Sequence, residues 1–102
     1  TIPEMEFPFY DAAQGVIALE YGHANQAIEA LGRSVERLRR INSPIAESAV
    51  DCYHGYLALA HAKAGDFDEA RRHYKLAEKR LRCQKIQDIR ERCEAALGRY
   101  AE

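Results

Sequence analysis

The chain repeats a helix-turn-helix pattern at an offset of 43 residues, the separation of Gly22 and Gly65. Small residues recur at the same offset after each glycine, so that Ala27 corresponds to Ala70. A unit of this length is one supersecondary element, which cannot bury its apolar face alone and must stack on a neighbour. The repeat therefore predicts stacked helical hairpins.

Apolar residues recur at intervals of three and four through most of the chain, which is the spacing of one helix face. The breakers Gly22, Gly65 and Pro44 fall between these periodic stretches. No alternating β-branched run bounded by turn residues is present, so the pattern predicts an all-α fold. We expect one domain over 1–102, with hairpin one at about 10–42, hairpin two at about 44–82 and a capping helix at about 85–101.

Several residues are typical of helix starts. Asp11 is placed to cap a first helix that begins near residue 10, and Ser43 to cap a third helix with Pro44 at its first position. Asp66 is placed to cap a fourth helix, and Glu69 three residues later completes a capping box. These signals set the expected hairpin boundaries.

The second copy of the repeat combines small and aromatic residues in a defined order. It reads Leu57-Ala58-x-x-His61-x-x-x-Gly65-Asp66-Phe67-Asp68-Glu69-Ala70-x-x-x-Tyr74-x-x-Ala77, and the first copy reads Gly15-x-x-Ala18-x-x-x-Gly22-x-Ala24-x-x-Ala27-x-x-x-Leu31-x-x-Ser34. The pattern resembles the tetratricopeptide repeat (TPR) family, and the offset, longer than the roughly 34 residues of the standard repeat, resembles its long-helix variants. The resemblance implies antiparallel hairpins stacked as a short right-handed solenoid of about two and a half repeats, with five helices and a C-terminal capping helix.

The resemblance also implies a protein–protein interaction module, because the first helix of each hairpin lines a concave groove in this family. The implied partner-binding residues are Phe9, Ala12, Val16, Leu19, Cys52, Gly55, Leu59 and Lys63. Only Lys63 matches the polar set that grips a C-terminal carboxylate, so we do not expect a carboxylate clamp. A mostly apolar groove suits an amphipathic helix, a peptide or a second copy of the chain, and a homodimer is the first expectation. Alternatively, the segment Ile2–Phe9 simply covers this face.

Charge is unevenly distributed, although the net charge is only −1. Five acidic residues and no Lys or Arg precede Arg33, whereas the stretch 71–85 holds seven basic residues and one acid. The expected basic patch is Arg71, Arg72, Lys75, Lys79, Arg80 and Arg82. It could receive an acidic partner or the acidic half of a second copy, or it could be an ordinary solvated helix face. Nucleic acid is not favoured as the partner, because no nucleic-acid module is visible and the whole chain is slightly negative.

Motifs of catalysis are not apparent. The run His61-Ala62-Lys63-Ala64-Gly65 superficially resembles the reactive site of a histidine phosphotransfer domain, which gives an alternative signalling role, but Lys63 is one residue too close. His54 and His61 are two turns apart, beyond the one-turn spacing of paired ligands, and His73 could gain a metal partner only from a distant part of the sequence. We therefore expect no enzyme activity, no cofactor and no metal site.

Composition places the chain among soluble, folding sequences, with 47% hydrophobic and 30% charged residues. No apolar run approaches the ~20 residues that span a bilayer, and the first residues are acidic where a signal peptide would be basic. The three cysteines are widely spaced and form no C-x-x-C pair, which favours reduced thiols. A cytoplasmic location without membrane association is the expectation.

Overall fold

Helices account for most of the residues 6–41, 43–83 and 87–97, the ranges that the computed structural model describes. They are α1 (Glu6–Glu20), α2 (Ala24–Arg39), α3 (Pro44–Lys63), α4 (Phe67–Cys83) and α5 (Gln87–Leu97). Within these ranges, side chains are described for 9–41, 43–78, 89 and 91–97. No strand occurs in the described ranges, so the predicted all-α fold is confirmed.

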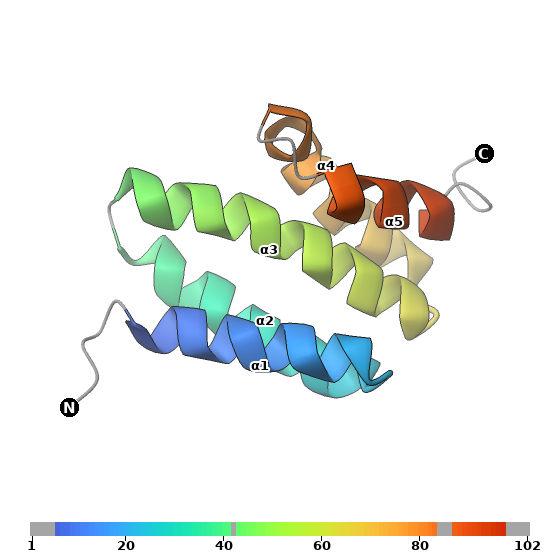
Figure 1. Cartoon of the computed structure of the whole chain (residues 1–102), viewed down its shortest axis with the longest axis horizontal. Helices are drawn as coiled ribbons and strands as arrows, with labels where there is room; N and C mark the ends of the chain where they lie inside the picture. The colour runs from blue at the N-terminus through green and yellow to red at the C-terminus, as the bar shows by residue number, and fades with distance from the viewer. Residues whose placement is uncertain (1–5, 42, 84–86, 98–102) are drawn as a thin grey trace.

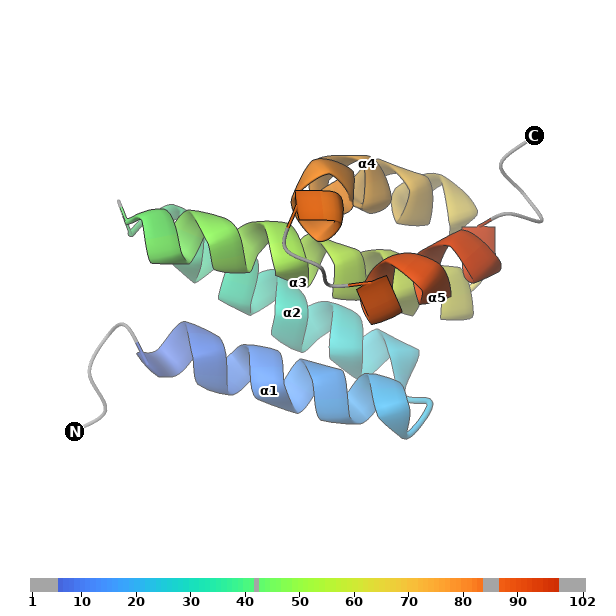
Figure 2. The same ribbon diagram turned by 45° about the horizontal axis from the view of Figure 1, so that its top comes forward.

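The helices follow one another as antiparallel neighbours (Figures 1 and 2). The pairs α1–α2, α2–α3 and α3–α4 pack along their lengths, and α5 returns to pack on both α3 and α4. The molecule measures 45 × 28 × 20 Å, and its shortest dimension fits two helices of about 10 Å each. Because α3 contacts every other helix, it lies at the centre of the packing.

The two predicted turns have the same conformation in both hairpins. Gly22 and Gly65 adopt φ of 81° and 88°, a left-handed region that glycine enters without the steric cost of a Cβ. The N–H of the residue after each glycine donates to a carbonyl five residues earlier, as in Asp66 N to His61 O at 2.9 Å. The glycine N–H itself bonds three residues back. Both α1 and α3 thus end in a Schellman motif, and the turns predicted at Gly22 and Gly65 are confirmed.

The predicted start of α3 is confirmed, and that of α4 is confirmed in part. Ser43 Oγ accepts a hydrogen bond from the backbone N–H of Ile45 at 3.2 Å, and Pro44 occupies the first helical position. Asp66 Oδ1 accepts from the N–H of Glu69 at 3.3 Å. The reciprocal half of the capping box is wrong, because the Asp66 N–H is already used by the preceding Schellman motif and the Glu69 carboxylate binds arginine instead.

The start of α1 was predicted too late. The helix begins at Glu6, so Pro8 lies inside its first turn, where a missing N–H removes no intrahelical hydrogen bond. Asp11 consequently lies a full turn inside the helix and is not its cap. Its carboxylate instead accepts a hydrogen bond from Arg37 Nη1 at 3.1 Å and lies 3.8 Å from Arg33 Nε.

α1 and α2 approach each other closely at Gly15. A Cβ at this position would lie 2.7 Å from Leu31 Cγ, 3.2 Å from the Leu31 nitrogen and 3.3 Å from the Ala27 carbonyl oxygen. Two of these atoms belong to backbone and cannot rotate away, so only glycine fits without moving the helices apart. The equivalent residue in hairpin two is Ala58, which is itself fully buried.

We expect Gly15→Ala to lower the free energy of unfolding by about 1–3 kcal/mol, since overpacking of the α1–α2 contact outweighs the better helix propensity of alanine. Gly32→Ala is the matched control, because that glycine is also inside a helix but no atom lies within 4 Å of the added Cβ. The control should gain about 0.5–1 kcal/mol. Urea unfolding followed by circular dichroism measures both, and equal gains in the two variants would contradict the close contact.

Candidate functional site

Half of the predicted groove residues do not form an open surface. Ala12, Leu19, Gly55 and Leu59 are buried. The prediction of an open apolar face is therefore wrong for Ala12 and Leu19, which pack in the core, whereas the largely buried Leu59 reaches the surface only at the pocket described next. Among the others, Phe9, Val16 and Cys52 are half-buried, Lys63 is exposed, and the Phe9 ring packs edge-on against Tyr53 with centroids 6.4 Å apart.

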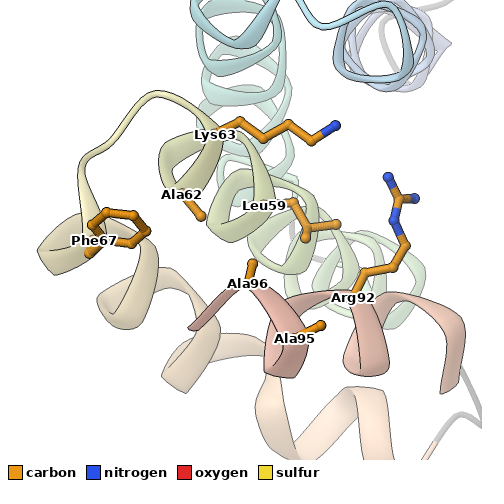
Figure 3. A pocket seen from close by; sticks show the side chains of 7 residues that line it. All are labelled: Leu59, Ala62, Lys63, Phe67, Arg92, Ala95 and Ala96. Carbon is orange, nitrogen blue, oxygen red and sulfur yellow. The ribbon is translucent and has the colours of Figure 1, made fainter. Parts of the chain in front are cut away.

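An open pocket of about 500 Å³ lies where α5 crosses the end of α3. We call it the α3–α5 pocket, and it is lined by Leu59, Ala62, Lys63, Phe67, Arg92, Ala95 and Ala96 (Figure 3). Leu59 and Lys63 thus belong both to the predicted groove and to this pocket. Its apolar walls carry two cations, and Arg92 Nη2 pairs with Glu20 Oε1 of α1 at 2.9 Å.

The predicted basic patch is partly neutralised within α4. Arg71 pairs with Asp68 at 2.6 Å and Arg72 with Glu69 at 2.7 Å, each acid lying one turn earlier. Lys75 is exposed, while the side chains of Lys79, Arg80 and Arg82 lie outside the described part of the chain. The acidic half of the chain also finds basic partners in the same molecule, through Asp11 with Arg37 and Glu20 with Arg92.

Three histidines meet between α3 and α4. The rings of His54 and His73, which we call the imidazole pair, are buried and stacked with centroids 5.1 Å apart, and their Nδ1 atoms lie 2.9 Å from each other. His61 also stacks on His73, with ring centroids 5.1 Å apart and an interplanar angle of 6°.

Two arginines constrain the proton arrangement of the imidazole pair. Arginine carries only donors, so Arg39 Nη2, 3.1 Å from His54 Nε2, requires that nitrogen to accept. His54, when neutral, then holds its proton on Nδ1 and donates to Nδ1 of His73. His73 then carries its proton on Nε2, which lies 3.7 Å from Glu69 Oε2, too far for a hydrogen bond. Arg72 Nη2, 3.4 Å from the same His73 nitrogen, would instead require it to accept, so the two arginines cannot both donate to neutral rings. The shorter Arg39 contact is the one that we assign as a hydrogen bond.

Burial and positive neighbours keep the imidazole pair neutral. Burial lowers the pKa of His54 to about 4, with a further contribution from Arg39 against an opposing one from Asp51. Burial likewise lowers the pKa of His73 to about 4, assisted by His54, Arg72 and His61 and opposed by Glu69. The hydrogen bond from Arg72 lowers the pKa of Glu69, so its carboxylate stays ionised beside the rings.

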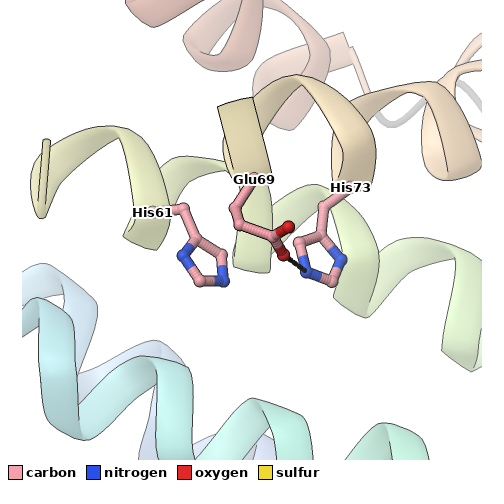
Figure 4. A group of neighbouring side chains, drawn as sticks. All are labelled: His61, Glu69 and His73. Carbon is pink, nitrogen blue, oxygen red and sulfur yellow. Dashed lines mark ion pairs between the residues drawn. The ribbon is translucent and has the colours of Figure 1, made fainter. Parts of the chain in front are cut away.

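Glu69 joins His61 and His73 to form a set of three metal-ligating residues, which we call the histidine–glutamate cluster (Figure 4). One nitrogen or oxygen atom from each lies within 4.8 Å of the others. No metal site was expected from the sequence, and no histidine was paired with a second ligand. The spacing of Glu69 and His73, four residues apart on one helix, is the signal that could have found two of its three members. The third member comes from α3 and has no signal in the sequence.

His61 is half-buried against His73. This does not match the exposed histidine that a phosphotransfer site requires.

Comparisons with other proteins add no assignment: no protein-family model, curated protein or solved structure matches the chain. Within the described residues, none of the helices combines the length and apolar character needed to cross a membrane.

The imidazole pair should make stability depend on pH. Because the folded pKa values lie below the ordinary 6.5, the unfolded chain binds more protons, so stability is complete above pH 6.5 and is lost as the pH falls toward about 4. We expect the free energy of unfolding to fall by about 2 kcal/mol or more between pH 7 and pH 5. Urea unfolding in the presence of EDTA measures this change.

The control is the double variant His54→Leu/His73→Leu, which keeps similar volume and removes both titrating rings together. The variant leaves every other ionisable side chain in place, so the difference between the two pH profiles isolates the pair. Parallel profiles for both proteins would contradict a neutral, buried imidazole pair.

Proposed function

We propose that the chain is a TPR-like interaction module that binds a segment of a partner protein in the α3–α5 pocket. The segment carries an apolar side chain next to one or more carboxylates. The observation that supports this most directly is the combination of an apolar pocket with Lys63 and Arg92 among its lining residues. The matching hairpin turns at Gly22 and Gly65 support the TPR-like assignment.

The apolar part of the pocket can supply affinity. Its volume of about 500 Å³ falls within the range of roughly 300–1,000 Å³ that is usual for ligand sites. Leu59, Phe67 and the alanines of α5 provide hydrophobic walls. Burying a leucine- or phenylalanine-sized side chain here would contribute roughly 1.5–3 kcal/mol before the cost of ordering the peptide.

The cationic part of the pocket can supply orientation. Arg92 already pairs with the carboxylate of Glu20, so this edge of the pocket can bind a carboxylate. Lys63 extends from the last turn of α3 on the same side of the pocket as Arg92 (Figure 3). A carboxylate of the partner between these two side chains would be attracted by both and would fix the direction of the bound segment.

A peptide-display selection on the purified protein should enrich sequences in which a large apolar residue adjoins Asp or Glu. For a synthetic peptide of the enriched sequence, we expect Lys63→Glu to weaken binding by about 10-fold, because a carboxylate replaces a cation at the mouth. Lys75→Glu is the matched control, since it reverses an exposed lysine outside the pocket. Fluorescence anisotropy measures both affinities.

A second variant tests the apolar part. Ala96→Trp should fill the pocket and abolish binding, while circular dichroism shows whether the helices remain. Enrichment of basic peptides, or an affinity unchanged by both Lys63→Glu and Ala96→Trp, would contradict the proposed site.

Self-association is the second candidate function, favoured by an apolar stripe on the outer face of α1. Tyr10, Ile17 and Tyr21 are 58%, 56% and 77% exposed, and their spacing of seven and four residues places them on one side of the helix. Two copies related by a two-fold axis would bring this stripe against itself. Removal of apolar surface from water would drive the pairing.

Light scattering should then give twice the chain mass of 11.6 kDa for the wild type. Ile17→Arg should restore the monomer, because it introduces a charge at the centre of the stripe. Leu76→Arg is the control, as Leu76 is similarly exposed on α4. A wild-type monomer over the accessible concentration range would exclude this second candidate and leave the peptide site unaffected.

A further inference from the structure

The histidine–glutamate cluster joins the two helices of hairpin two at their shared turn. Glu69 and His73 lie one turn apart near the start of α4, and His61 lies in the last turn of α3 (Figure 4). His61 and Glu69 are half-buried and His73 is buried, so the group is anchored in the core but open to solvent on one side. One ligand atom from each residue lies within 4.8 Å of the others.

We propose that His61, Glu69 and His73 bind a divalent transition-metal ion of the zinc type. Two imidazole nitrogens and one carboxylate oxygen are a ligand set that zinc takes in proteins, with the fourth position left to water. Hard ions such as Mg²⁺ and Ca²⁺ prefer all-oxygen sets, so the two histidines select against them.

Arg72 already shows that this position attracts a cation. Its Nη2 atom lies 2.7 Å from Glu69 Oε2 and 3.4 Å from His73 Nε2, between two of the proposed ligand atoms. The guanidinium therefore stands where a metal ion would neutralise the same carboxylate. Its side chain is 58% exposed and can swing into solvent when the ion binds.

The distances require only side-chain adjustment. Ligand atoms around a tetrahedral zinc lie roughly 3.3 Å apart. Glu69 Oε2 and His73 Nε2 are 3.7 Å apart, so these two are close to that value. The half-buried His61 must rotate out of its parallel stack on His73 so that its nitrogen points at the ion.

His54 would act as the positioning residue of the site. A metal on Nε2 of His73 needs the His73 proton on Nδ1, where it donates to Nδ1 of His54 at 2.9 Å. The proton of His54 then moves to Nε2, so both rings remain neutral and none is released. Arg39, an exposed donor 3.1 Å from that nitrogen, must turn away.

Hairpin one provides an internal comparison. The positions 43 residues before His61, Glu69 and His73 hold Ala18, Gln26 and Ala30. The same hairpin geometry therefore forms without any of the three ligands. The turn and the helix packing therefore do not require a buried histidine beside a carboxylate. A role in ligand binding would explain why hairpin two has these three residues.

The test uses the untagged protein, stripped of metal with EDTA and desalted. Titration with Co²⁺ should give the visible absorption bands of a tetrahedral ion, without thiolate charge-transfer bands, and Zn²⁺ should displace Co²⁺ at one ion per chain. Isothermal calorimetry with Zn²⁺ gives the affinity. His61→Ala and Glu69→Gln should weaken it by at least the roughly 100-fold that loss of an outer-shell partner can cause.

Two further variants complete the design. His23→Ala removes an exposed histidine outside the cluster and should leave the affinity unchanged. Arg72→Gln removes the competing cation and should tighten binding by roughly 10-fold. Glu69→Gln keeps the shape of the side chain, so weak binding in a variant with unchanged circular dichroism cannot be assigned to unfolding.

The proposal is overturned if the wild type takes up no Zn²⁺, if thiolate bands appear with Co²⁺, or if His23→Ala weakens binding as much as His61→Ala does. Peptide binding in the α3–α5 pocket is measured with EDTA present. The failure of one proposal is therefore distinguishable from the failure of the other.

Discussion

The packing of four helices around α3 is the constraint on which the rest of the molecule depends. Small buried residues along α3, namely Ala46, Gly55, Ala58 and Ala60, let its neighbours approach closely. At Gly55 the carbonyl oxygen accepts a weak hydrogen bond from the thiol of Cys93 on α5, at 3.4 Å. Burial raises the pKa of that thiol to about 12, so it remains a protonated donor and serves packing rather than chemistry. With α3 enclosed in this way, polar side chains on it must find partners among its neighbours, which is what His54 does.

Features that depend on a few consecutive residues were predicted correctly from the sequence. Features that depend on which side of a helix meets its neighbours were not. The turns at Gly22 and Gly65 and the cap at Ser43 follow from the chemistry of one to four consecutive residues, and all three are present. The prediction of an open groove on α1 was wrong because of how apolar residues are distributed around that helix. That helix carries apolar residues on both sides, such as Leu19 inside and Ile17 outside, so periodicity alone cannot say which side meets α2. The α3–α5 pocket could not be predicted either, because Arg92 and Ala96 reach it only through the return of α5 onto α3.

Equivalent positions in the two hairpins carry different polar side chains. His54 corresponds to Asp11 at the offset of 43 residues. Asp11 pairs with Arg37 of α2, the second helix of its own hairpin, whereas His54 contacts Arg39 of the same α2, which belongs to the other hairpin. A polar residue facing an arginine is thus common to both copies. What distinguishes hairpin two is the second ring: His73 stands where hairpin one has an alanine, and it extends the polar contact toward the half-exposed Glu69.

The α3–α4 turn places the two candidate sites within a few residues of each other. Ala62 and Phe67 line the pocket, while His61 and Glu69 belong to the histidine–glutamate cluster, one and two residues away in the sequence. Adjacent residues on a helix point in different directions, so the same two helix ends serve both sites on different faces. A metal ion joining His61 to Glu69 would fix the end of α3 against the start of α4. Since Phe67 is the first residue of α4, the same metal ion would also hold this wall of the pocket in place. Any coupling between ion and peptide would therefore be reciprocal, each ligand stabilising the turn geometry that the other requires.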